Sequence, residues 1–314
     1  MNIVFCGTPE FAVPALRALL EAGDFTVPLV VCQPDRPAGR GLEVAPPPVK
    51  KVALEYGIPL AQPARIKDNP EFRSRLESLR PAAIVVVAYG RIIPPWMLSL
   101  PQFGNINLHA SLLPKYRGAA PIQWAIASGE TVTGVTSMRL DAGLDTGDVL
   151  LQAAAPIRAE DTAETLASRL AVLGAPLVLE TLRRLASGQI TPEPQDAAQA
   201  TYAPLLTKED GRIAFARSAQ EIANRLRGFT PWPGAYSSFR GKAINFWNAT
   251  PAARPPGTPE LASGELLASV ERLLVGCGHN TVLEIATLQV EGKKRMPAAD
   301  FVHGYKPRPG EMLG

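Results

Sequence analysis

The first half of the chain alternates short apolar runs with segments whose apolar residues recur at helical spacing. The runs are mostly continuous and rich in β-branched residues, which is typical of strands buried on both faces of a sheet. This alternation predicts an α/β domain with mostly parallel strands. The expected strands span residues 3–6, 27–32, 83–88 and 105–109, and the expected helices span 11–22, 49–56, 71–79 and 122–128.

A longer helical pattern over 162–186 begins at Asp161 and Thr162, whose side chains can cap the first turn. The stretch after Gly188 is polar, contains prolines and has little periodicity, as in an interdomain linker. Beyond it, one more helix pattern precedes short strand patterns separated by turn signals, which predict a small barrel or sandwich. We therefore expect a first domain over 1–188, a linker over 189–206 and a second domain over 207–314.

The composition agrees with a folded, two-domain protein. The chain has 314 residues, of which 46% are hydrophobic. Its N-terminus enters a strand-like run without a basic leader, and no stretch reaches ~18 consecutive apolar residues, so we expect neither secretion nor a membrane span. Cys6, Cys32 and Cys277 lie far apart and form no disulfide or zinc pattern, which favours the cytoplasm and no bound metal.

Positive charge is concentrated in the C-terminal third. Residues 207–314 carry 14 Lys and Arg against 10 Asp and Glu, whereas residues 1–206 carry 18 against 19. A modest basic excess fits either contact with nucleic acid or an ordinary solvated surface.

The most informative stretch is the expected strand 105–109 and the proline-ended loop after it. Asn107 and His109 are two residues apart, so they project from one strand face at the carboxyl end, where α/β sheets bind ligands. A tight acidic loop over 141–148 supplies Asp145, which could reach the imidazole. A histidine at a strand end can also be a hydrogen-bonded structural residue, but its pairing with Asn107 and the acidic loop favours a catalytic site.

These stretches resemble the folate-dependent formyltransferases, above all the members that act on methionyl-tRNA. The resemblance covers nearly the whole chain, and several spaced motifs in one order are more specific than any single motif. It implies a Rossmann-like catalytic domain followed by a small OB-like β-barrel. The matching motifs span residues 5–11, 33–41, 87–90, 109–114 and 143–148.

The resemblance implies that Asn107, His109 and Asp145 are the catalytic residues. In such a reaction an amine attacks the formyl carbon of 10-formyltetrahydrofolate, an oxyanion develops, and a proton passes from one nitrogen to the other. An amide and an imidazole held by a carboxylate suit these tasks without a metal.

The resemblance also implies folate contacts, which we expect from Ser111, Leu112, Leu113 and Pro114. Arg91 and Ile92 are further candidates, near an apolar slot at the end of an expected strand. Val86 and Val87 can equally be sheet core, and Arg91 can be a solvated charge.

Contacts with tRNA are implied for the long loop over 34–48, through Arg36 and Arg40, and for the second domain, through Lys293 and Lys294. The chain departs from some relatives directly after this arginine, because it has Leu42-Glu43-Val44 where they carry lysines. This difference weakens the expected electrostatic contribution of the loop. The two lysines can also belong to a solvated turn.

The implied reaction is formyl transfer from 10-formyltetrahydrofolate to the methionine α-amine of initiator methionyl-tRNA, with no obligate protein partner. Formylation of glycinamide ribonucleotide or of an amino-sugar nucleotide is the nearest alternative, since such enzymes share the Asn-His-Asp site. A catalytically silent tRNA-binding protein is a third possibility, which the presence of all three site residues disfavours.

Overall fold

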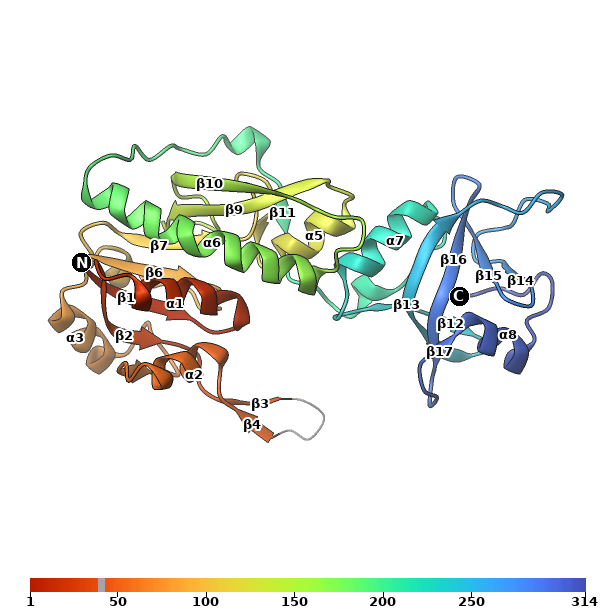
Figure 1. The fold of residues 1–314 in the computed structure, drawn as a ribbon, viewed down its shortest axis with the longest axis horizontal. Helices are drawn as coiled ribbons and strands as arrows, with labels where there is room; N and C mark the ends of the chain where they lie inside the picture. The colour runs from red at the N-terminus through yellow and green to blue at the C-terminus, as the bar shows by residue number, and fades with distance from the viewer. Residues whose placement is uncertain (39–42) are drawn as a thin grey trace. The chain divides into compact units, whose positions relative to one another are not determined.

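The computed structural model describes residues 1–38 and 43–314, which form two compact units (Figure 1). Each unit draws on separate stretches of the chain. Unit 1 consists of 1–121, 132–156 and 167–203, and unit 2 consists of 122–131, 157–166 and 204–314.

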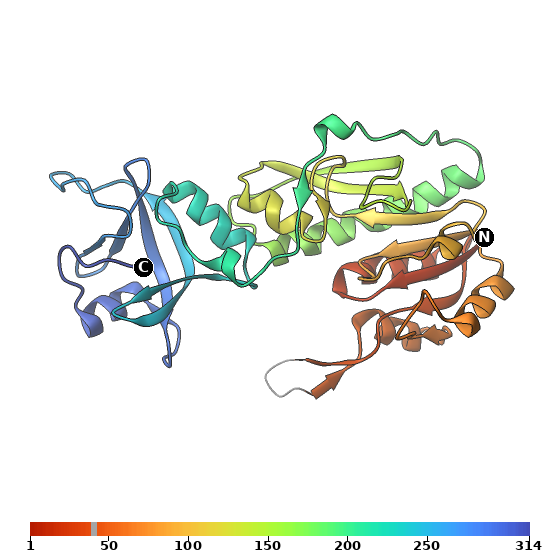
Figure 2. The ribbon, with the colours of Figure 1, turned by 180° about the vertical axis from the view of Figure 1, so that it is seen from behind.

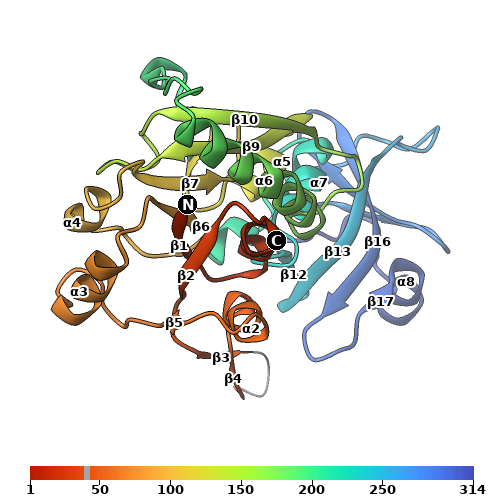
Figure 3. The same ribbon diagram turned by 60° about the vertical axis from the view of Figure 1, so that its left-hand side comes forward.

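Unit 1 is built on a seven-stranded sheet in the order β10-β9-β7-β6-β1-β2-β5 (Figure 3). The five strands from β7 to β5 pair in parallel, and β9 and β10 add an antiparallel edge. The predicted α/β class with a mostly parallel sheet is confirmed. The strands are β1 (Asn2–Gly7), β2 (Thr26–Val31), β5 (Leu60–Ala61), β6 (Ala83–Val87), β7 (Asn105–His109), β9 (Val132–Arg139) and β10 (Val149–Pro156).

Helices pack on both faces of this sheet. Phe72 and Leu76 of α3 form one core cluster with Ile84 and Val86 of β6. On the opposite face, α6 approaches so closely that a Cβ on Gly174 would lie 2.5 Å from Leu108 of β7. The helices of unit 1 are α1 (Val13–Glu21), α2 (Pro48–Glu55), α3 (Pro70–Leu79), α4 (Pro95–Leu98) and most of α6 (Ala163–Ala186), with the 3₁₀ helix η1 (Glu10–Ala12) before α1, whereas nearly all of α5 (Pro121–Ala127) belongs to unit 2.

Helix α6 is long and apolar enough to cross a membrane by length and composition. It has 24 residues and a mean hydropathy of 1.4 over its most apolar window, half of which is buried inside the protein. The core helix of a soluble protein passes the same test, so this helix is weak evidence for a membrane span.

Two short pairings complete unit 1. The arms β3 (Arg36–Ala38) and β4 (Glu43–Ala45) are antiparallel and belong to the predicted long loop. Strand β8 (Arg117–Gly118) pairs in parallel with β11 (Tyr202–Ala203), which lies in the stretch expected to be a linker.

Unit 2 is dominated by an antiparallel sheet in the order β12-β13-β16-β15-β14, with β17 beside β16 (cyan to dark blue in Figure 2). Ile222 and Leu226 of α7 and Phe301 of α8 share a core cluster with this sheet. The predicted β-rich second part is confirmed. Its elements are α7 (Ala219–Gly228), β12 (Ala235–Phe239), β13 (Lys242–Ala252), β14 (Leu266–Ala268), β15 (Leu273–Cys277), β16 (Thr281–Val290), β17 (Met296–Pro297) and α8 (Ala298–Tyr305), with the 3₁₀ helix η3 (Glu209–Gly211) before α7 and η2 (Ala197–Gln199) in unit 1.

Unit 2 also includes two stretches that precede the expected linker. Trp124 of α5 packs edge-on against Phe229, with ring centroids 5.4 Å apart, and its indole N–H donates to the Pro204 carbonyl at 2.9 Å. Arg227 donates to the Asp161 carbonyl at 3.0 Å. Stretches 122–131 and 157–166 therefore pack with the C-terminal part of the chain.

Candidate active site

Strand β7 presents Asn107 and His109 on one face of the sheet of unit 1. Asn105, two residues earlier on the same face of the strand, donates its amide to the Met97 carbonyl of α4 at 2.8 Å. This is therefore the face of the sheet that α4 contacts. His109 is buried, with 5% of its surface exposed. Asn107 is partly exposed, and within 1–38 and 43–314 its side chain makes no hydrogen bond. The Asn107 amide is therefore available to a ligand.

The imidazole of His109 lies between two acceptors. Its Nε2 atom is 2.9 Å from the Tyr116 carbonyl oxygen, which can only accept, so Nε2 carries the hydrogen of this bond. On the other side, Nδ1 lies 3.6 Å from Oδ2 of Asp145. Both ring nitrogens thus face oxygen atoms of the protein, and donation to a substrate oxygen requires the ring to leave one of them.

Asp145 occupies a tight loop that directs its carboxylate toward His109. Its Oδ2 atom accepts a hydrogen bond from the Gly118 N–H at 2.8 Å, and its backbone has a positive φ of 52°. A Cβ on Gly147 would lie 1.8 Å from the Arg139 carbonyl oxygen, so this close return of the chain requires glycine. These contacts determine the shape of the loop.

Two further residues hold this loop, and the sequence reasoning missed both. Gln195 donates its amide to the carbonyls of Asp145 at 2.8 Å and Gly147 at 2.7 Å. Its oxygen accepts from Nε and Nη2 of the buried Arg117 at 3.0 and 2.8 Å. Gln195 directly follows closely spaced prolines, which favour an extended, defined backbone. This was the sequence signal that could have pointed to an ordered segment there.

The loop over 111–114 is anchored mainly through its own backbone. The Thr136 hydroxyl donates to the Ser111 carbonyl at 2.6 Å and accepts from the Leu113 N–H at 3.1 Å. Gln152 donates to the Leu113 carbonyl at 2.9 Å. Ser111 and Leu113 are buried, whereas Leu112 and Pro114 are partly exposed. Folate contact by these four residues stays a prediction.

Arg91 and Ile92 follow β6 on the turn at its carboxyl end. Ile92 is 93% exposed, and the Nε atom of Arg91 is buried without a hydrogen-bond partner in the described part of the chain. The nearby Tyr89 hydroxyl is likewise buried and unpartnered there, and burial raises the pKa of Tyr89. The Arg91 Nε–H and the Tyr89 hydroxyl can therefore each form a further hydrogen bond. Contact of Arg91 and Ile92 with folate stays a prediction.

A polar network joins the carboxyl ends of β1, β2 and β6. The Thr8 hydroxyl and the Gln33 amide both donate to the Tyr89 carbonyl, at 3.1 and 3.0 Å. Lys50 pairs with Asp35 at 2.6 Å, and hydrogen bonds from Gln62 and then Lys50 lower the pKa of Asp35. This edge of the sheet is therefore preorganised beside the site.

The residues expected to contact tRNA are distributed over both units. Arg36 is exposed on β3, and Arg40 lies outside the described residues. Lys293 and Lys294 are exposed on the turn between β16 and β17 of unit 2. The neighbouring Arg295 places its guanidinium 3.5 Å from the ring centre of Trp247. Their contact with tRNA stays a prediction.

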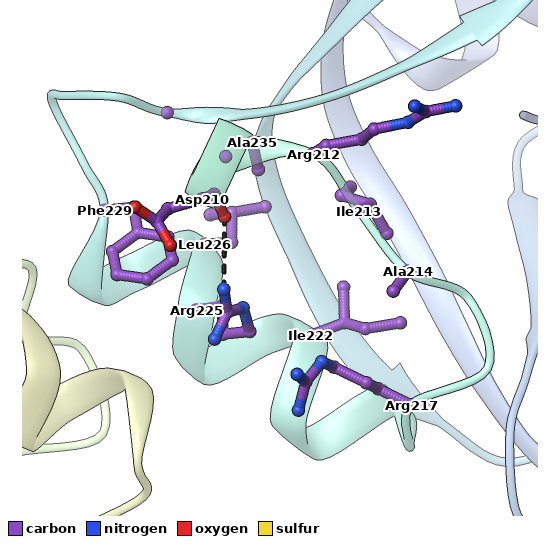
Figure 4. A pocket seen from close by; sticks show the side chains of 12 residues that line it. Asp210, Arg212, Ile213, Ala214, Arg217, Ile222, Arg225, Leu226, Phe229 and Ala235 are labelled. Carbon is purple, nitrogen blue, oxygen red and sulfur yellow. Dashed lines mark hydrogen bonds between the residues drawn. The ribbon is translucent and has the colours of Figure 1, made fainter. Parts of the chain in front are cut away.

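A small space lies beside α7 in unit 2 (Figure 4). It measures about 10 Å³, which is room for roughly one water molecule. Arg225 donates to the Asp210 carbonyl there at 3.2 Å, and Arg217 pairs with Glu221 at 3.5 Å. A folate cannot enter this space. Across residues 1–38 and 43–314, no group of three or more His, Cys, Asp or Glu residues is arranged to hold a metal.

Comparison with known proteins identifies relatives over the full chain. The chain is 60% identical over 314 residues to the methionyl-tRNA formyltransferase of Koribacter versatilis, covering 100% of this chain and 99% of that protein. It is 58% identical over 318 residues to that of Acidobacterium capsulatum, with 100% of both covered. The family predicted from the sequence is confirmed.

Solved structures share the fold at low identity. The N-formyltransferase of Helicobacter canadensis, in complex with folinic acid and dTDP-3-aminofucose, has a TM-score of 0.66 at 18% identity and covers 90% of this chain and 98% of its own. Glycinamide ribonucleotide transformylase 1 of Symbiobacterium toebii has a TM-score of 0.51 at 23% identity and covers 62% of this chain and 94% of its own.

Family models match both parts of the sequence. The model described as Formyl transferase matches residues 1–182, and the model described as Formyl transferase, C-terminal domain, matches residues 205–306. The chain therefore belongs to the formyl transferase family.

Proposed function

We propose that this protein transfers the formyl group of 10-formyltetrahydrofolate to the α-amino group of methionine on initiator methionyl-tRNA, for translation initiation. The observation that carries the proposal is the convergence of His109 and Asp145, 3.6 Å apart, on the face of β7 that also bears Asn107, in a chain with full-length relatives named for this reaction. The relatives' names support the acceptor, and the convergence supports the chemistry.

The reaction assigns a task to each of the three groups. The methionine amine attacks the formyl carbon, and a negatively charged oxygen develops on the tetrahedral intermediate. The unpartnered amide of Asn107 donates to that oxygen. His109, with Asp145 beside it, stabilises the same oxygen or carries the proton from the attacking nitrogen to the departing folate nitrogen.

The donor is proposed from the family and from the anchored loop beside the site. A structure of HypX from Aquifex aeolicus, which shares the fold at 20% identity and a TM-score of 0.60, was solved in complex with tetrahydrofolic acid. We assign folate binding in this protein to the loop 111–114, with Arg91 and Ile92 at the edge of the folate site. The formyl group at N10 is then presented to the β7 end.

The acceptor requires contacts well beyond the catalytic groups. We assign the tRNA to Arg36 and Arg40 of the long loop and to Lys293 and Lys294 of the second domain, all of which supply positive charge for phosphates. The division into a catalytic domain over 1–188, a linker over 189–206 and a tRNA-binding domain over 207–314 belongs to the same proposal, as does a cytoplasmic location.

Two other acceptors are consistent with the fold. An amino-sugar nucleotide is favoured by the fold shared with the Helicobacter canadensis enzyme, but only at 18% identity. Glycinamide ribonucleotide is disfavoured because the Symbiobacterium toebii structure matches only 62% of this chain.

A competition assay separates the three acceptors. The protein is incubated with 10-formyltetrahydrofolate and equal concentrations of methionyl initiator tRNA, glycinamide ribonucleotide and an amino-sugar nucleotide, and the formylated products are quantified. We expect formyl-methionyl-tRNA as the main product. Preferential formylation of either small molecule would refute the proposed acceptor, and no transfer to any of them would refute the enzyme assignment.

A further inference from the structure

The two oxygen atoms that flank His109 are tied to one segment of the chain, residues 193–203, which we name the strap. One flanking oxygen belongs to Asp145 and the other to the Tyr116 backbone. The strap falls within the stretch that the sequence pattern marked as a linker. All of these residues belong to unit 1.

On the Asp145 side, the strap holds the backbone of the acidic loop. The amide of Gln195 donates to the carbonyls of Asp145 and Gly147 at 2.8 and 2.7 Å. Glu193 exchanges two backbone hydrogen bonds with Val149, at 2.8 and 2.9 Å. Hydrogen bonds thus hold the loop at Asp145 and again at Val149, directly after its last residue.

On the Tyr116 side, the strap pairs with the chain that follows the 111–114 loop. Thr201 accepts from the Tyr116 N–H through its hydroxyl and from the Arg117 N–H through its carbonyl, both at 2.8 Å. A Cβ on Gly118 would lie 2.7 Å from the Ala203 carbonyl oxygen, so the two segments of the chain are in close contact. The Gly118 N–H that binds Asp145 is fixed by this pairing.

Arg117 connects the two sides. Only 4% of its surface is exposed, and its guanidinium donates twice to the Gln195 oxygen, at 3.0 and 2.8 Å. The side chain of Gln195 therefore uses its oxygen toward Arg117 and its amide hydrogens toward the Asp145 loop. A glutamate could keep the first contact, but it has no hydrogens for the second.

We propose that Gln195 is a positioning residue, which acts on the reaction by holding Asp145 beside His109. The buried Arg117 in turn fixes the orientation of the Gln195 side chain. The inference rests on the proposed formyl transfer. Because a displacement of about 1 Å can cost roughly 10²-fold in rate, loss of these two hydrogen bonds should slow the chemical step by ~10- to 100-fold.

The test is a double-mutant cycle on single-turnover formylation of methionyl-tRNA, with Gln195→Ala, Asp145→Ala and the double variant. We expect Gln195→Ala to lower the single-turnover rate and to shift its pH profile in the same direction as Asp145→Ala, with little change in KM for tRNA. The double variant should be no slower than Asp145→Ala, because Gln195 acts through that residue. Rate losses that multiply would overturn the inference.

Gln195→Glu tests the donor role without removing the partner of Arg117. We expect it to be as slow as Gln195→Ala, and a rate equal to wild type would overturn the inference. Gln199→Ala is the matched control, since Gln199 is an exposed glutamine of the strap whose side chain, among the described residues, bonds only to the Asp196 carboxylate. If wild type itself forms no formyl-methionyl-tRNA, the proposed function fails instead, so the two failures are distinguishable.

Discussion

His109 and Asp145 lie with Nδ1 of the imidazole 3.6 Å from Oδ2 of the carboxylate, and that same oxygen accepts a 2.8 Å hydrogen bond from the Gly118 N–H. The backbone donor fixes the carboxylate independently of the histidine. Asp145 can therefore stabilise a positive charge that forms on the ring while the ring itself moves toward a substrate. A carboxylate bound only to the imidazole would have to move with it.

Replacement of Asn107 by alanine should remove a donor to the developing oxyanion. We expect kcat for formyl transfer to fall by ~10² to 10³-fold, with KM nearly unchanged, because the interaction is made in the transition state. The thermal midpoint of unfolding should stay close to that of wild type, since the amide has no partner within the described residues. A large rise in KM at unchanged kcat would contradict the assigned role.

Replacement of His109 by alanine should remove the acid–base or charge-stabilising group. We expect a loss of ~10² to 10⁴-fold in the single-turnover rate. Affinity for tRNA, measured by filter binding, should remain almost intact, because the ring is buried beside the loop and not on a charged surface. A parallel loss of tRNA affinity would show that His109 supports the architecture of the binding surface instead.

The shared strand face of Asn107 and His109 could be predicted from sequence because strand periodicity is local. Asn107 and His109 follow from the side-chain alternation of one strand, and Asp145 from a compact acidic loop. The contributions of Arg117 and Gln195 depend on a contact between residues 78 positions apart in the sequence, which no local pattern predicts. The Tyr116 contact could not be predicted for a different reason, because a backbone carbonyl has no sequence signature.

The same distinction applies to the fold. The parallel core was predictable from continuous apolar runs such as 83–88. The assignment of 122–131 and 157–166 to unit 2 was not, because the packing of Trp124 on Phe229 joins residues about a hundred positions apart. The polar, proline-containing composition of 189–206 predicts an interdomain linker, and the hydrogen bonds that hold its central part depend on contacts with residues distant in sequence.

Substitution of Lys293 by alanine should weaken tRNA binding through the loss of a phosphate contact. We expect the slope of log Kd against log salt to decrease by about 0.7 to 0.9. Lys67→Ala is the matched control, since Lys67 is an exposed lysine outside the proposed tRNA surface. Equal slopes for Lys293→Ala and wild type would identify Lys293 as part of a solvated turn. Deletion of 207–314 is a poorer test, because it would strip Trp124 of its partner Phe229.

Acid stability should depend on Glu311. Hydrogen bonds from Arg240 and then from the Arg308 backbone lower the pKa of Glu311 to about 2. Because the folded-state pKa is below the ordinary value, the stabilisation is present above about pH 4.5 and is lost as the pH falls toward 2. We expect Glu311→Gln to be slightly less stable than wild type at pH 7, where exposed pairs contribute little. Denaturant titrations at low salt should show this difference shrinking below pH 4.5, and a difference independent of pH would contradict it.

The most direct test of the proposed catalytic group is single-turnover formylation of methionyl initiator tRNA by Asp145→Ala, with tRNA affinity measured on the same preparation. If the carboxylate acts on His109, the rate should fall by at least ~10²-fold while the Kd for tRNA stays within about twofold of wild type. A variant that formylates tRNA at the wild-type rate, or that loses binding and rate together, would contradict it.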